Sequence, residues 1–228
     1  MPEWWTYSLS DFLMFSSRTY YRQFELLNAE VWPAQVVALA LGLAIVALWL
    51  RELRAGQLHA GRIAAIILAA AWLWVAWAYL LGHYDDINWT GRYFAAGFAA
   101  QALLLIFAAM RNRLALRGPG DGCGRAGMAL VGMALVGYPL VAILFGRSWT
   151  QAEVFAIAPD PTVMATLGIV AAAVRPNWEL LVLPLIWCAY SGATLWTMES
   201  PDAALLPAAA ALTIVLEAGK GRLLPAPH

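Results

Sequence analysis

Apolar residues occur in long runs along the chain, separated by short polar connections. Five runs are long enough to cross a membrane as helices: 33–50, 63–81, 93–110, 128–145 and 178–198. Two further runs, 161–174 and 203–216, are shorter. Because a helix of about 20 apolar residues crosses a hydrocarbon core roughly 30 Å thick, the pattern predicts an all-α polytopic transmembrane bundle of about seven spans.

A different pattern precedes the first apolar run. Tyr20, Phe24, Leu27 and Val31 are spaced by four, three and four residues, which is typical of one face of an amphipathic helix. Aromatic residues are also frequent in the tail before them, and aromatic rings favour the headgroup layer of a bilayer. We therefore expect residues 1–32 to form an N-terminal interfacial segment and residues 33–228 to form the transmembrane helical domain.

The composition agrees with a membrane location. Of the 228 residues, 62% are hydrophobic and only 12% are charged, against roughly a quarter charged in soluble domains. The formal net charge is zero, so the charge balance gives no indication of a nucleic-acid partner. The partner that the composition predicts is the lipid bilayer.

The charged residues are distributed unevenly between the two sets of connections. One set is rich in arginine, whereas the other carries most of the aspartate and glutamate. Connections rich in Lys and Arg remain in the cytoplasm. We therefore expect the N-terminus outside and the C-terminus inside, with the only lysine, Lys220, in the cytoplasm beyond the last predicted span.

The sequence APDPT, residues 158–162, places Asp160 between two prolines at the start of the run 161–174. A structural explanation is a helix cap, because an aspartate at a helix N-terminus accepts backbone hydrogen bonds and faces the positive end of the helix dipole. A functional explanation is a polar cavity that opens outward, because ionisable groups at membrane depth mark binding sites. The ligand-binding candidates for such a cavity are Asp160, Thr162, Thr166, Glu153 and His83.

Neither metal binding nor catalysis has a recognisable motif. His83 is followed by Asp85 and Asp86, but the repeated His or Cys spacing of metal sites is absent from the sequence. Motifs of the GxSxG and HExxH type are also absent. We assign no metal, expect no cofactor and favour a function other than catalysis, with an enzyme left open. Cys123 and Cys188 lie at different expected depths, which does not favour a disulfide.

Several segments together are similar to a known family. They are WWTYSLSDFLMF, YYRQFELLNAEVWPAQ, INWTGRYFAAGF, AEVFAIAPDPTVMATLG and LIWCAYSGATLW. With these segments the chain resembles a bacterial family of polytopic membrane proteins that is catalogued as a domain of unknown function. The resemblance implies a protein of the bacterial inner membrane, and it implies no activity, ligand or catalytic residue.

Three functions fit these features. The first is a small-solute or ion carrier in which Asp160 binds a cation or a proton and the threonine hydroxyls contribute oxygen ligands. The second is a non-catalytic accessory subunit or scaffold of a larger membrane protein complex. The third is an enzyme that modifies a lipid or a quinone. The sequence leaves all three open, together with the identity of any small-molecule or ion ligand.

Overall fold

A computed structural model describes residues 15–55 and 59–223 of the chain. The described residues fold into helices, and the only strand-like pairing among them is an isolated bridge between Leu116 and Ala173. The α-helices are α1 (Ser17–Glu30), α2 (Ala34–Ala55), α3 (Ala60–Val75), α4 (Gly91–Met110), α5 (Gly122–Gly132), α6 (Tyr138–Leu144), α7 (Pro159–Ala172), α8 (Val182–Thr197) and α9 (Leu205–Leu223). The predicted all-α bundle is therefore confirmed.

Short helical segments of other types extend these helices or connect them. A π-helix, η3 (Ala76–Tyr84), continues α3, and a second one, η4 (Met133–Gly137), joins α5 to α6. The 3-10 helix η5 (Trp149–Gln151) precedes α7, and η6 (Trp178–Leu180) precedes α8. The long apolar runs of the sequence therefore remain continuous helical rods even where the α-helical hydrogen bonding changes.

Five rods in the described residues are long and apolar enough to cross a membrane. They cover Ala34–Arg54, Ala60–Tyr84, Gly91–Met110, Gly122–Leu144 and Trp178–Thr197. They coincide with the five long runs predicted from the sequence. The two shorter predicted spans are also helical, as α7 and α9, but neither is among these five.

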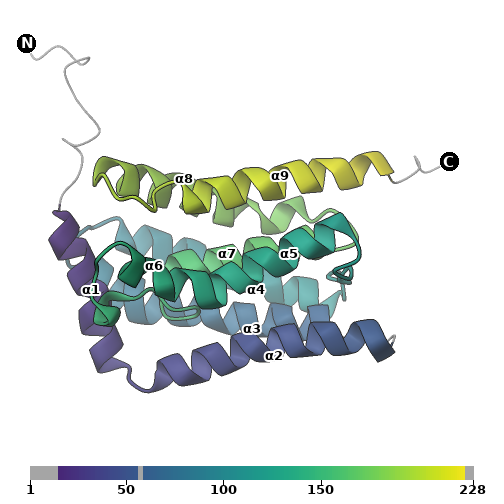
Figure 1. Cartoon of the computed structure of the whole chain (residues 1–228), viewed down its shortest axis with the longest axis horizontal. Coiled ribbons are helices and arrows are strands. Elements are labelled where there is room, and N and C mark those ends of the chain that lie inside the picture. The colour runs from purple at the N-terminus through teal and green to yellow at the C-terminus, as the bar shows by residue number, and fades with distance from the viewer. Residues whose placement is uncertain (1–14, 56–58, 224–228) are drawn as a thin grey trace, which may run out of the picture.

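The helix α1 lies across one end of the bundle helices (Figure 1). Its N-cap is Ser16, whose Oγ accepts a hydrogen bond from the backbone N–H of Thr19 at 3.2 Å. It buries Tyr20, Phe24 and Leu27, which confirms the amphipathic helix predicted from their spacing. Residues 1–14, which include the aromatic tail of the predicted interfacial segment, lie outside the described residues.

The helix α7 occupies the middle of the bundle (Figure 1). Every one of its 14 residues is buried, and it packs against α3, α5, α8 and α9. It lies close to α5, because a Cβ atom added at Gly168 would lie only 2.7 Å from the carbonyl oxygen of Gly127. The short helix is thus enclosed on all sides by other helices.

The last helix differs from its prediction. From the apolar run 203–216, Lys220 was expected beyond the last span. In the structure, α9 continues to Leu223 and Lys220 is buried. Lys220 Nζ donates a hydrogen bond to the carbonyl oxygen of Val170 at 2.9 Å and pairs with Glu217. The long aliphatic stem of lysine fits an apolar helix face, and the partners at its tip compensate for the loss of water.

Candidate functional site

Asp160 lies in the first turn of α7 and is fully buried. Its Oδ1 accepts a hydrogen bond from Nε1 of Trp187, and its Oδ2 accepts one from Oγ of Ser191, each at 2.7 Å. Both donors belong to α8. The carboxylate therefore joins two helices at a helix N-terminus, where the dipole of α7 also favours a negative charge.

The capping explanation of Asp160 does not match its position. The N-cap residue of α7 is Ala158, with extended backbone angles and no side-chain capping hydrogen bond. Asp160 stands two residues further on, and its side chain is directed to α8 instead of the backbone of its own helix. The two prolines fit this start, because the first helical positions need no backbone N–H.

The two candidate threonines are engaged in bonds within the protein. Thr162 Oγ1 donates to the carbonyl oxygen of Ala158 at 2.7 Å and accepts from the N–H of Ala156 at 2.9 Å. Thr166 Oγ1 donates to the carbonyl oxygen of Thr162 and accepts from Nε1 of Trp72, both at 2.9 Å. These hydroxyls stabilise the backbone that carries Asp160.

The bond from Ala156 holds an unusual backbone conformation. Ala156 has a φ of +60°, in the left-handed region that residues with a Cβ atom rarely adopt. This conformation turns the buried connection 152–158 into the start of α7. Conformations of this kind persist where the surrounding structure holds them, and they concentrate at functional sites.

An arginine that the sequence did not single out lies beside this segment. Arg147 pairs through Nη1 with Oε1 of Glu153 at 3.3 Å, and through Nη2 with Oδ2 of Asp202 at 2.8 Å. Its guanidinium also stacks on the ring of Tyr21, 4.0 Å from the ring centroid. The arginine therefore connects α1, the connection before α7 and the connection between α8 and α9.

We refer to Arg147, Glu153, Asp160 and Asp202 as the acidic cluster. Its three carboxylates belong to residues that are each at most 3% exposed. Arg147 pairs with those of Glu153 and Asp202, whereas that of Asp160 is bound by α8. One acceptor is left over, because Oε2 of Glu153 is buried without a hydrogen-bond partner. Burying an ionised carboxylate without full pairing is energetically costly.

The connection that carries Glu153 lies outside the five span-length helices. Burial raises the pKa of the Glu153 carboxyl above its usual range. The nearby carboxylate of Asp160 adds to this rise, whereas the guanidinium of Arg147 opposes it. Burial therefore favours the protonated form of Glu153, and a proton there would reduce the excess of buried negative charge.

Aromatic side chains of α1, η3 and α8 pack together beside the acidic cluster. The ring of Phe24 stacks on that of Tyr79 with centroids 4.9 Å apart, and the hydroxyl oxygens of Tyr84 and Tyr190 lie 2.5 Å apart. The hydroxyl of Tyr79 is buried without a hydrogen-bond partner.

His83 is separate from the other candidates. It lies near the end of η3, where its Nε2 is 3.1 Å from Oε2 of Glu30, an exposed residue at the end of α1. The structure thus brings Asp160, Glu153, Thr162 and Thr166 together and leaves His83 outside the group. Within residues 15–55 and 59–223, no three His, Cys, Asp or Glu side chains are arranged to hold a metal ion.

The fold and these buried charges define an all-helical protein with several helices suited to crossing a membrane. The chain belongs to a family of unknown function, DUF6064, whose family model matches residues 17–224. This match confirms the prediction that the chain belongs to a family without an assigned function. Neither the curated proteins nor the solved structures contain a match to the chain.

Proposed function

We propose that this chain is an integral membrane carrier that couples the movement of a small solute to a proton bound at Glu153, next to Asp160. The observation that carries the proposal is the excess of buried carboxylates at the start of a short, fully buried helix. Each part of this arrangement has a physical reason.

The length of α7 supports the proposal. Its 14 residues extend over about 21 Å, which is less than the roughly 30 Å of a hydrocarbon core. Carriers commonly place their sites where a helix begins or is interrupted within the membrane, because the helix terminus there offers a dipole and free backbone groups. Asp160 lies at such a terminus.

The hydrogen bonds favour Glu153 as the proton site. Both oxygens of Asp160 accept hydrogen bonds, and Asp202 accepts bonds from Arg147 and Ser200. These bonds stabilise the ionised carboxylates. Glu153 instead has one oxygen without a partner, so a proton that binds there removes a buried charge. In the proposed carrier, this proton is the one whose movement is coupled to that of the solute.

The proposal includes a location and an orientation. The family resemblance favours a bacterial inner membrane, and the unequal distribution of arginine favours an N-terminus outside. The acidic cluster then belongs to the outer half of the protein, because it contacts α1 through Tyr21.

Reconstituted vesicles test the carrier function. Vesicles loaded with a pH-sensitive dye receive external sugars, amino acids and small carboxylates in turn. We expect at least one of these solutes to accelerate proton entry with the unchanged protein and not with Glu153→Gln. The control Glu179→Gln alters an exposed glutamate that pairs with Arg113 and should transport normally. Absence of solute-dependent proton entry across the panel would contradict the proposal.

Infrared spectroscopy tests the proton site without a solute. The carbonyl stretch of a protonated carboxyl group is distinct from the bands of an ionised carboxylate. We expect a band of this kind in the unchanged protein near neutral pH and its loss in Glu153→Gln, with the band retained in Glu179→Gln. A spectrum identical in all three proteins would show that Glu153 does not hold the proton.

A further inference from the structure

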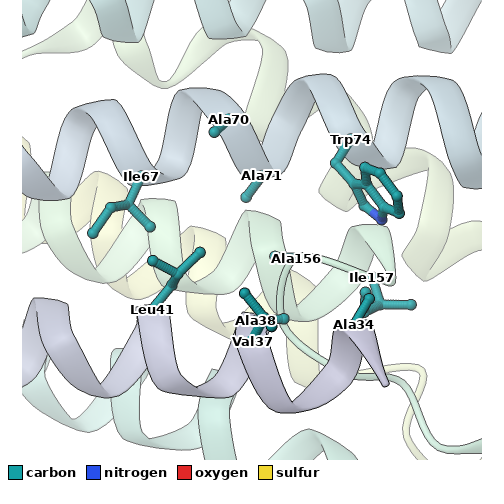
Figure 2. A pocket seen from close by; sticks show the side chains of 10 residues that line it. All are labelled: Ala34, Val37, Ala38, Leu41, Ile67, Ala70, Ala71, Trp74, Ala156 and Ile157. Atoms are coloured by element: carbon teal, nitrogen blue, oxygen red, sulfur yellow. The ribbon is translucent and has the colours of Figure 1, made fainter. Parts of the chain in front are cut away.

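A slot with a volume of about 310 Å³ lies between α2 and α3 (Figure 2). Its walls are formed by residues of these two helices, and its floor by two residues of the connection before α7. The lining residues are Ala34, Val37, Ala38, Leu41, Ile67, Ala70, Ala71, Trp74, Ala156 and Ile157. All of these side chains are apolar except for the indole N–H of Trp74.

Alanines on the two facing helices create the slot. Ala38 of α2 and Ala71 of α3 are both buried, and their single methyl groups leave space that larger side chains would fill. At the rim, Val37 and Leu41 are exposed. Because both walls are helices of membrane-spanning length, the medium outside this rim is the hydrocarbon of the bilayer.

The slot runs parallel to the helices and has two different ends. Ala34, Trp74 and Ile157 lie at one end, and Leu41 and Ile67 lie at the other (Figure 2). Ala34 is the first residue of α2 and follows closely after α1, so the Trp74 end of the slot is nearer to the membrane interface than the Leu41 end. Tryptophan suits this end, because its ring packs in an apolar layer and its N–H binds polar groups.

We propose that this slot binds one acyl chain of a bilayer glycerophospholipid, with the ester and headgroup of the lipid at the Trp74 end. An apolar cavity does not hold water, and an empty one forfeits the dispersion contacts of its lining. A linear chain from the adjacent bilayer fills an elongated slot of this kind. The indole N–H at the Trp74 end is a donor for an ester carbonyl of the lipid.

This binding differs from the general contact of a membrane helix with lipid. The floor of the slot consists of Ala156 and Ile157, which are buried in the protein, so a chain that reaches them is inserted between two helices. Ala156 is also the residue whose N–H is bound by Thr162. The bound chain therefore supports the connection that carries Glu153, and removal of the lipid is expected to lower the thermal stability.

Photocrosslinking tests the proposal on the unchanged protein. A glycerophospholipid with a diazirine at the end of one acyl chain is added to protein in nanodiscs, and the labelled peptides are mapped. We expect labelling of residues 156–157 together with α2 and α3. Labelling restricted to rim positions such as Val37 and Leu41 would show ordinary surrounding lipid and overturn the proposal.

Native mass spectrometry after detergent purification gives a second test. We expect one retained phospholipid per chain, its loss in Ala38→Phe, and its retention in Ala40→Phe, which adds the same ring on an exposed position of α2. Added palmitoyl-oleoyl phosphatidylglycerol should raise the unfolding temperature of the unchanged protein and of Ala40→Phe. Retention of an isoprenoid quinone instead of the phospholipid, or a dimer that Ala38→Phe dissociates, would refute the proposed occupant. Neither test depends on the carrier function.

Discussion

The indole N–H of Trp187 donates a hydrogen bond to Oδ1 of Asp160 across 2.7 Å in the interior of the bundle. The same indole ring lies nearly perpendicular to the rings of Phe94 and Phe98, with both centroids 5.1 Å away. Two aromatic side chains of α4 thus hold the indole ring of Trp187 in place, and this ring in turn positions the carboxylate of Asp160. The position of Asp160 is determined by α4 and α8 together, as well as by its own helix.

The second donor to Asp160 provides the first prediction. In Ser191→Ala, Oδ2 of Asp160 loses its partner at full burial, and hydrogen bonds to charged groups contribute about 1.5–3 kcal/mol. We expect a loss of unfolding free energy of that size, measured by denaturation in one fixed detergent. Thr197→Ala, at a partly exposed position on α8, is the control and should change stability little. Equal stability of both variants would contradict a structural role for the Ser191 bond.

Arg147 provides the second prediction. Arg147→Met leaves the buried carboxylates of Glu153 and Asp202 without their cationic partner, and breaking a buried ion pair costs about 3–5 kcal/mol. Arg92→Met removes the exposed pair with Asp85, for which about 0–1 kcal/mol is expected. Thermal unfolding of the two variants should therefore differ clearly. A similar unfolding temperature for both would show that the cluster tolerates the loss of Arg147.

The five long helices were predictable because their apolar runs match the length that hydrocarbon requires. The central helix was also predictable in outline, since the run 161–174 overlaps α7 (Pro159–Ala172). The burial of α7 on every side could not be predicted. A helix that is apolar all round has the same sequence pattern whether lipid or protein surrounds it. That distinction depends on neighbours that are distant in the sequence.

The candidate site was predictable only in part. Asp160 and Glu153 could be selected because charges next to apolar runs are rare, and the structure places both in one buried cluster. Arg147 and Asp202 are 55 residues apart, and each resembles an ordinary charged residue of a connection. One signal was present for Lys220, because it follows Glu217 by three residues on a helix whose end the hydropathy pattern underestimated.

The crossing of α5 and α7 provides the third prediction. A Cβ atom at Gly168 would meet the backbone oxygen of Gly127 at 2.7 Å, whereas one at Gly132 would meet nothing within 4 Å. Overpacking of a core costs typically 1–3 kcal/mol, so we expect Gly168→Ala to lower the unfolding temperature. Gly132→Ala should leave it unchanged or raise it, because alanine favours a helix by up to about 1 kcal/mol over glycine. The reverse order of the two variants would contradict this packing.

Cysteine labelling provides the fourth prediction, which concerns orientation. The connection 85–90 lies at the α1 end of the bundle, because His83 contacts Glu30. The connection 111–121 lies at the other end, where Nε1 of Trp49 binds the carbonyl oxygen of Arg117. With the N-terminus outside, an impermeant maleimide on intact cells should label a cysteine in the first connection and spare one in the second.

Suitable positions are Asp86, which is exposed, and Gly120, around which an added Cβ meets open space. Both substitutions, Asp86→Cys and Gly120→Cys, are made in a Cys123→Ser background, and Cys188 is buried. We expect Gly120→Cys to react only after the membrane is permeabilised, because arginine-rich connections resist translocation. If Gly120→Cys reacted in intact cells and Asp86→Cys required permeabilisation, the orientation would be inverted and the acidic cluster would belong to the cytoplasmic half.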